Sequence, residues 1–116
     1  MTHRSTITPE VKTNYSVGAI LVDSWGWEQT NVDFYAIIKR SGDFVTIQMM
    51  KVQETFKGRE MTSEVLPLEV DPKAKPIRRK VKSFNGEEKG FSLRDYAGGG
   101  WTKLWSGSVQ TATHYA

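Results

Sequence analysis

Two runs of alternating residues and the turn between them decide the fold class: Val32-Asp-Phe-Tyr-Ala-Ile-Ile-Lys-Arg40, Ser41-Gly42-Asp43 and Phe44-Val-Thr-Ile-Gln-Met-Met-Lys-Val52. Side chains alternate between two faces in a strand, so residues two apart share a face. The residues expected to face the core are Val32, Phe34, Ala36 and Ile38. A Ser-Gly-Asp segment between two such runs is typical of a tight turn. We therefore predict two antiparallel strands, with Asp33 and Tyr35 on the face away from the core.

The flanking sequence continues the β pattern. Ala19 to Ser24 is apolar and predicts a buried strand that follows a turn at Val17-Gly18 and completes a three-stranded meander. Later extended segments are expected at 64–70, 77–83, 91–96 and 101–105, with loops at 55–62 and 85–88. Pro67 removes a backbone donor, so its strand should be an edge strand or contain a break. With no amphipathic helix visible, we predict an all-β fold, either a small SH3-like barrel or a strongly bent antiparallel sheet.

Composition narrows the class of protein. The chain has 116 residues, no cysteine and a net charge of +3, which fits one domain without disulfides or thiolate metal sites. We expect a flexible N-terminal arm over residues 1–14 and a single β domain over residues 15–116. The start is not a signal peptide, and no run approaches the roughly 20 apolar residues of a membrane span. These features suggest a cytoplasmic protein that does not associate with membranes, and we expect no cofactor.

The loop between the first two strands is rich in groups that recognise partners. It runs Ser24-Trp-Gly-Trp-Glu-Gln-Thr-Asn-Val-Asp-Phe-Tyr35, which is more chemistry than a turn requires. The candidate binding residues are Trp25, Trp27, Gln29, Thr30, Asn31, Asp33 and Tyr35. In the alternative interpretation the indoles cap the fold and the amides bond the loop to itself, a role we favour for Asn31. We expect Trp25 to be the more buried indole and Trp27 the more exposed.

A basic segment supplies the second candidate surface. If residues 77–83 form one strand, Arg78, Lys80 and Lys82 share an outer face, while Ile77 and Val81 point inward. Cations spaced in this way can follow a phosphate backbone. The alternative is a charged edge strand that only prevents aggregation. Glu87 and Glu88 follow closely and would weaken the positive field.

The remaining motifs favour structure over catalysis. Gly98-Gly99-Gly100 lacks the Lys and the helix of a phosphate loop. Trp101 and Trp105 lie four residues apart and should share a strand face, as core residues or as part of an aromatic cage for a cation. Asp33 and His114 could form an acid–base couple, but no spacing indicates one. No set of three convergent ligands predicts a metal site.

The Ser24–Tyr35 segment resembles a family of small uncharacterised proteins of bacteriophages and other mobile elements. The recurrent pattern is Ser-Trp-Gly-aromatic-acid-Gln-Thr-Asn and then Phe-Tyr, preceded here by Val17-Gly-Ala-Ile20. The endings Leu104-Trp-Ser-Gly107 and Thr113-His-Tyr-Ala116 are also similar. Trp27 stands where a tyrosine is more usual. The resemblance implies a phage or prophage setting inside a bacterial cell, and it implies no activity.

These observations lead to three hypotheses about function. The first is a non-enzymatic phage accessory protein that binds nucleic acid through the loop and the basic strand. The second is a modulator of a bacterial host protein, such as a defence or replication factor. The third is a small enzyme that uses Asp33 and His114. A continuous basic surface beside the loop would favour the first, and a flat neutral aromatic patch the second.

Overall fold

The protein is built from strands. The computed structural model describes residues 11–26, 29–56, 62–93 and 101–113. Within these ranges the chain forms nine strands and no helix, and therefore no helix that could cross a membrane. The strands are β1 (Ile20–Trp25), β2 (Asn31–Ser41), β3 (Phe44–Phe56), β4 (Thr62–Val70), β5 (Ile77–Lys80), β6 (Lys82–Phe84), β7 (Glu87–Gly90), β8 (Lys103–Leu104) and β9 (Gln110–Thr113).

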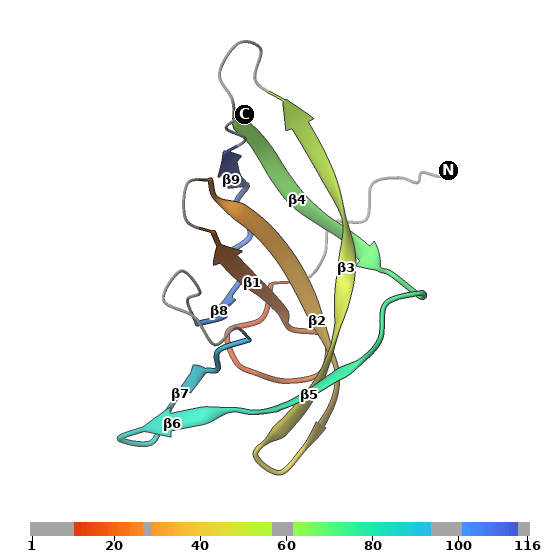
Figure 1. Cartoon of the computed structure of the whole chain (residues 1–116). Helices are drawn as coiled ribbons and strands as arrows, with labels where there is room; N and C mark the ends of the chain where they lie inside the picture. The colour runs from red at the N-terminus through yellow and green to blue at the C-terminus, as the bar shows by residue number, and fades with distance from the viewer. Residues whose placement is uncertain (1–10, 27–28, 57–61, 94–100, 114–116) are drawn as a thin grey trace, which may run out of the picture.

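One strongly curled antiparallel sheet dominates the molecule and forms a half-barrel (Figure 1). Its strand order is β8-β1-β2-β3-β4-β9, and β5 pairs with Phe44–Ile47 of β3 outside this path. The strands β6 and β7 form a separate hairpin. The prediction of an all-β, strongly bent antiparallel sheet is confirmed.

The predicted meander is present as β1, β2 and β3. β1 pairs with β2 from Ile20 opposite Ala36 to Trp25 opposite Asn31. β2 and β3 meet at the predicted turn, where Ser41 pairs with Phe44. Two boundaries differ from expectation. β3 continues to Phe56, into residues we assigned to a loop, and a bulge at residue 38 leaves Ile38 exposed, not in the core.

The central strands bury both of their faces, which the sequence pattern did not predict. Phe34 and Ala36 point into the half-barrel, as expected, whereas Tyr35 and Ile37 are buried on the outer side. The inner core comprises Ile20, Val22, Phe34, Ala36, Met50, Val65, Trp105 and Ala112. The outer core comprises Tyr15, Ala19, Leu21, Tyr35, Ile37, Val45, Ile47, Val81 and Phe91. The expectation of one core face was wrong because residues 15–19 and the chain after β5 cover the second face.

The two edge strands of the curled sheet, β8 and β9, are joined by the short segment 105–109 and approach each other without pairing. The Trp105 amide donates to the Ile20 carbonyl at 2.8 Å, which extends the pairing of β8 with β1 by one residue. The Thr113 amide donates to the Thr30 carbonyl at 2.9 Å and so joins the end of β9 to the residue before β2. The half-barrel is therefore fastened between β9 and the start of β2, whereas β8 and β9 do not pair along the seam.

Proline and the basic segment define two further boundaries. β9 covers only Thr62–Val65 of β4, so Pro67 lies on the uncovered part of that edge, opposite a register shift in β3. This confirms the prediction that the strand with Pro67 is an edge strand or contains a break.

The single strand predicted over residues 77–83 is wrong, because buried Val81 separates β5 from β6.

The segment after β6 also differs from expectation. Glu87 and Glu88 belong to a strand of the β6–β7 hairpin, where a loop was expected. The strand predicted over residues 91–96 is reduced, among its described residues, to one bridge between Ser92 and Trp101. Residues 94–96 lie outside the described part of the chain.

Candidate nucleic-acid interface

The loop between β1 and β2 is held by its own polar groups. Trp25 is half-buried, and its Nε1 donates to Asp33 Oδ2 at 2.9 Å. The Asn31 side-chain amide reaches the Trp25 carbonyl at 3.4 Å, as expected for a residue that bonds the loop to itself. A Cβ on Gly26 would lie 2.1 Å from the Gln29 carbonyl oxygen. The glycine of the Trp-Gly-Trp motif is thus required by the close approach of the chain.

The same loop is fastened to the C-terminal strand. Thr30 accepts a backbone hydrogen bond from Thr113, and its own amide donates to the Thr113 hydroxyl. Tyr35 is only 4% exposed and packs in the outer core, so it does not contribute to a binding surface. Trp27 lies outside the described residues. The loop therefore has a clear architectural role, whatever Trp27 contributes.

The loop and the basic segment lie at opposite ends of β2. The loop enters β2 at Asn31, whereas β5 sits beside the part of β3 that pairs with Ile37–Ser41. Ten residues of strand, roughly 30 Å, separate the two ends. Figure 1 shows the loop and β5 far apart along the sheet. They do not form the continuous surface that we considered from the sequence.

The basic segment presents its cations to solvent. Arg78, Lys80 and Lys82 are all exposed, whereas Val81 is buried and Ile77 packs against the outer core. The expected inward orientation of Ile77 and Val81 is therefore confirmed, although the cations are divided between β5 and β6. We call the row Arg78, Lys80 and Lys82 the basic stripe. Arg78 and Lys80 lie about 7 Å apart along β5, and Lys82 begins β6 after the buried Val81.

The nearby carboxylates are committed to other cations. Glu88 forms a two-pronged ion pair with Arg40, with Nη2–Oε2 at 2.6 Å and Nη1–Oε1 at 3.3 Å. The hydrogen bond to Glu88 raises the pKa of Arg40. Glu87 pairs with Lys89 at 3.1 Å. Among the described residues the basic stripe has no such ion pair, so these acids neutralise it less than the sequence suggested.

An aromatic ring lies under the start of the basic stripe. The Arg78 guanidinium carbon is 4.0 Å from the centroid of the Phe44 ring, a cation–π contact. In the pairing of β3 with β5, Phe44 lies opposite Lys80 and Thr46 lies opposite Arg78. On the other side of β3, Thr46 lies opposite Lys39 of β2, so Lys39 and Arg78 flank the same residue. One face of β2–β3–β5 thus combines three exposed cations, Lys39, Arg78 and Lys80, with a half-buried phenyl ring.

The other end of the basic stripe meets a pair of exposed aromatic rings. Phe84 of β6 is 55% exposed and Trp101 is 43% exposed, and their ring centroids lie 6.2 Å apart at an angle of 42°. Trp105, by contrast, is 3% exposed and packs edge-on against Phe34. Trp105 is therefore a core residue, one of the two roles considered for these indoles, whereas Trp101 remains at the surface. Phe84 was not predicted as a binding residue, because no local sequence pattern marks it.

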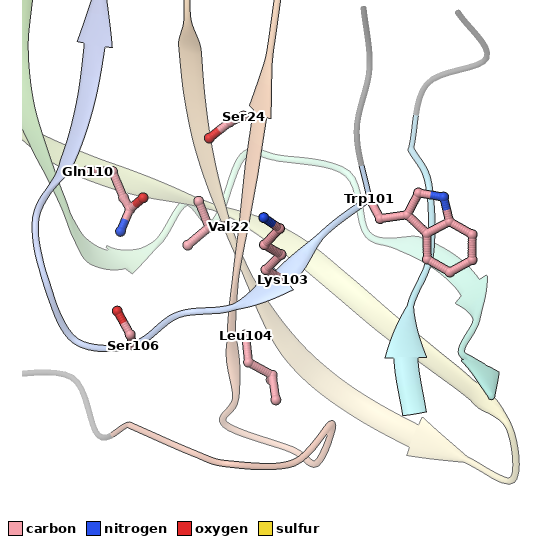
Figure 2. Close-up of a pocket in the computed structure, with 7 residues that line it drawn as sticks. All are labelled: Val22, Ser24, Trp101, Lys103, Leu104, Ser106 and Gln110. Carbon is pink, nitrogen blue, oxygen red and sulfur yellow. The ribbon is translucent and has the colours of Figure 1, made fainter. Parts of the chain in front are cut away.

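The open seam of the half-barrel forms a hollow of about 590 Å³. Its lining residues are Val22, Ser24, Trp101, Lys103, Leu104, Ser106 and Gln110. Figure 2 shows Lys103 beside Val22, with Ser24 above them and Gln110 on the far side of Val22, whereas the Trp101 indole points away from these residues. The hollow therefore combines polar and apolar groups and has Trp101 only at its margin.

The structure adds little to the hypothesis of catalysis. Asp23 is fully buried and lies opposite Asp33 in the β1–β2 register. His114, the proposed partner of Asp33, lies outside the described residues, as does His3. Within the described ranges no three His, Cys, Asp or Glu residues gather in a way that could hold a metal ion. The acid–base couple remains a prediction from sequence.

Comparison of the chain with protein-family models, with curated proteins and with solved structures gave no match.

Proposed function

We propose that this protein is a non-enzymatic accessory protein that binds nucleic acid through the basic stripe. The observation that carries the proposal is the exposure of Arg78 and Lys80 in β5 and of Lys82 at the start of β6, while the neighbouring Glu87 and Glu88 are bound to Lys89 and Arg40. Exposed cations at regular spacing favour contacts with successive phosphates, the main source of affinity for nucleic acids.

The adjacent sheet face supports the same partner. Lys39 adds a fourth exposed cation near Arg78 and Lys80. Asp43, in the turn between β2 and β3, lies close to this face and reduces its positive field somewhat. The expected binding is therefore of moderate affinity, strongly salt-dependent and largely independent of sequence.

The biological setting is also a proposal. The resemblance of Ser24–Tyr35 to small proteins of phages and mobile elements supports a role in the cytoplasm of an infected bacterium. A bacterial host protein is the alternative partner, and the exposed Phe84–Trp101 pair is the feature that favours it, since aromatic side chains often anchor protein interfaces.

A titration of labelled oligonucleotides, followed by fluorescence anisotropy over a range of salt concentrations, tests the proposal. Replacing Arg78, Lys80 and Lys82 together with Gln should weaken binding and lower the slope of log K against log salt by about 2 to 3 units, because three phosphate contacts are lost. The matched control replaces Lys51, Lys73 and Lys103, three exposed lysines outside the basic stripe, with Gln.

The control variant loses the same net charge but should keep most of the salt dependence. Equal weakening in both variants would show that only net charge matters and not the basic stripe. Absence of binding by the unmodified protein at low salt would reject nucleic acid as the partner and favour a host protein.

A further inference from the structure

We propose that the ligand of the basic stripe is single-stranded and that one of its bases stacks on the Phe84–Trp101 pair. This inference rests on the proposed function and goes beyond it, because cations alone do not distinguish a single strand from a duplex. What distinguishes them is access to the flat faces of the bases, which are stacked inside a duplex and available in a single strand.

The aromatic pair lies at the end of the basic stripe. Phe84 is two residues beyond Lys82 in β6, and a register shift between Lys82 and Ser83 interrupts the regular alternation there. The chain from Arg78 to Phe84 spans at most about 20 Å. A strand whose phosphates contact the three cations therefore arrives directly at the rings.

The geometry of the two rings leaves room for a base. The ring centroids are 6.2 Å apart and tilted by 42°, so the rings do not cover each other face to face. Both side chains are about half exposed, at 55% and 43%. Figure 2 shows the Trp101 indole directed away from the seam hollow. The two adjacent exposed rings form an apolar patch, and such patches mark interaction sites on protein surfaces.

The positive charge of Lys82 beside the Phe84 and Trp101 rings favours a nucleotide over an apolar protein surface as the ligand. An apolar protein surface that docked on Phe84 and Trp101 would also have to accommodate Lys82 in the same strand, whereas a nucleotide uses both features, its phosphate contacting the cation and its base the rings. At the opposite end of the basic stripe the Phe44–Arg78 stack provides a second place where a planar group meets an aromatic ring.

The experiment compares three probes of equal length and the same label: a single-stranded DNA, its duplex, and a strand whose residues lack bases. The unmodified protein should bind the single strand at least several-fold more tightly than the other two. Trp101→Ala and Phe84→Ala should each weaken single-strand binding by about 5- to 150-fold, the range for loss of one stacked base. Neither substitution should change binding of the strand without bases.

Two control variants keep the result interpretable. Trp101→Phe retains an aromatic face and should restore most of the affinity. Phe56→Ala removes a ring that is 65% exposed at the far end of β3 and should have no effect. Thermal melting of each variant, unchanged from the unmodified protein, shows that folding is intact.

The outcomes separate this inference from the proposed function. If duplex and single strand bind equally, and the aromatic variants bind as well as the unmodified protein while the Gln variant of the basic stripe does not, then stacking is wrong and phosphate binding stands. If no probe binds at low salt, both proposals are rejected and the aromatic pair becomes a candidate surface for a protein partner.

Discussion

Arg40 and Glu88 join β2 to the β6–β7 hairpin through a two-pronged ion pair whose shorter contact is 2.6 Å. Arg40 also donates to the Tyr15 carbonyl at 2.7 Å and to the Gly42 carbonyl at 2.9 Å. One guanidinium therefore connects the segment before β1, the β2–β3 turn and the hairpin. This connection positions the hairpin, and with it Lys82 and Phe84, against the curled sheet.

Glu88→Gln should destabilise the fold and leave the sheet intact. The side chains of Arg40 and Glu88 are 24% and 34% exposed, so solvent screens the pair and the expected loss is about 1 kcal/mol in the free energy of unfolding. Glu87→Gln is the matched control, because Glu87 pairs with Lys89 on a more exposed surface, and it should change stability by less than about 0.5 kcal/mol. Urea unfolding measures both, and equal losses would contradict the assigned role of Glu88.

The two tryptophans of the 101–105 segment should differ sharply in their contribution to stability. Trp105 is buried in the inner core against Phe34, and its Nε1 donates to the Ser108 carbonyl at 2.7 Å. Trp105→Ala should cost about 3 to 5 kcal/mol. Trp101→Ala removes an exposed ring and should cost under about 1 kcal/mol. The urea midpoints of the two variants measure this difference in stability. A larger loss for Trp101→Ala than for Trp105→Ala would contradict the packing of these side chains.

Tyr15 should make stability fall at alkaline pH. Burial, with a smaller effect of the negative charge on Glu88, raises the pKa of Tyr15 above its ordinary value of 10.0. Because the folded pKa lies above the unfolded pKa, the contribution is complete below about pH 10 and is lost as the pH rises through the folded pKa. Tyr15→Phe should therefore show a shallower decline in unfolding free energy above pH 10. Identical pH profiles would show that Tyr15 is not the group responsible.

Gly26→Ala should disrupt the Trp-Gly-Trp loop. Gly26 has φ of +125°, and an added Cβ would meet the Gln29 carbonyl oxygen at 2.1 Å, so the chain between Trp25 and Asn31 must move. We expect a loss of at least about 2 kcal/mol in unfolding free energy from strain and lost loop contacts. At Gly42, also at positive φ, a Cβ would meet no atom within 4 Å. Gly42→Ala should therefore cost only about 1 kcal/mol, and equal costs in thermal or urea unfolding would show that backbone angle, not crowding, governs both sites.

Sequence alone determined the parts of the fold that depend on neighbouring residues. Alternation across Val32–Arg40 and Phe44–Val52, with Ser41-Gly42-Asp43 between them, predicted the meander, because strand period and turn chemistry are local properties. Pro67 predicted a strand edge because a missing N–H has the same consequence in any sheet. The exposure of Arg78, Lys80 and Lys82 was expected from the same alternation, although Arg79 between them is exposed as well.

Only the tertiary structure decided which faces are covered and which surfaces meet. Tyr35 and Ile37 are buried because residues 15–19 and the chain after β5 pack on the outer face of the sheet, a contact between distant segments. The β1–β2 loop and the basic stripe lie at opposite ends of β2, because β5 pairs with the part of β3 that lies opposite Ile37–Ser41. Phe84 and Trp101 are 17 residues apart and become neighbours because the bridge between Ser92 and Trp101 returns the chain to the hairpin. Alternation specifies the two sides of a strand, but the segment that covers each side is chosen by long-range packing.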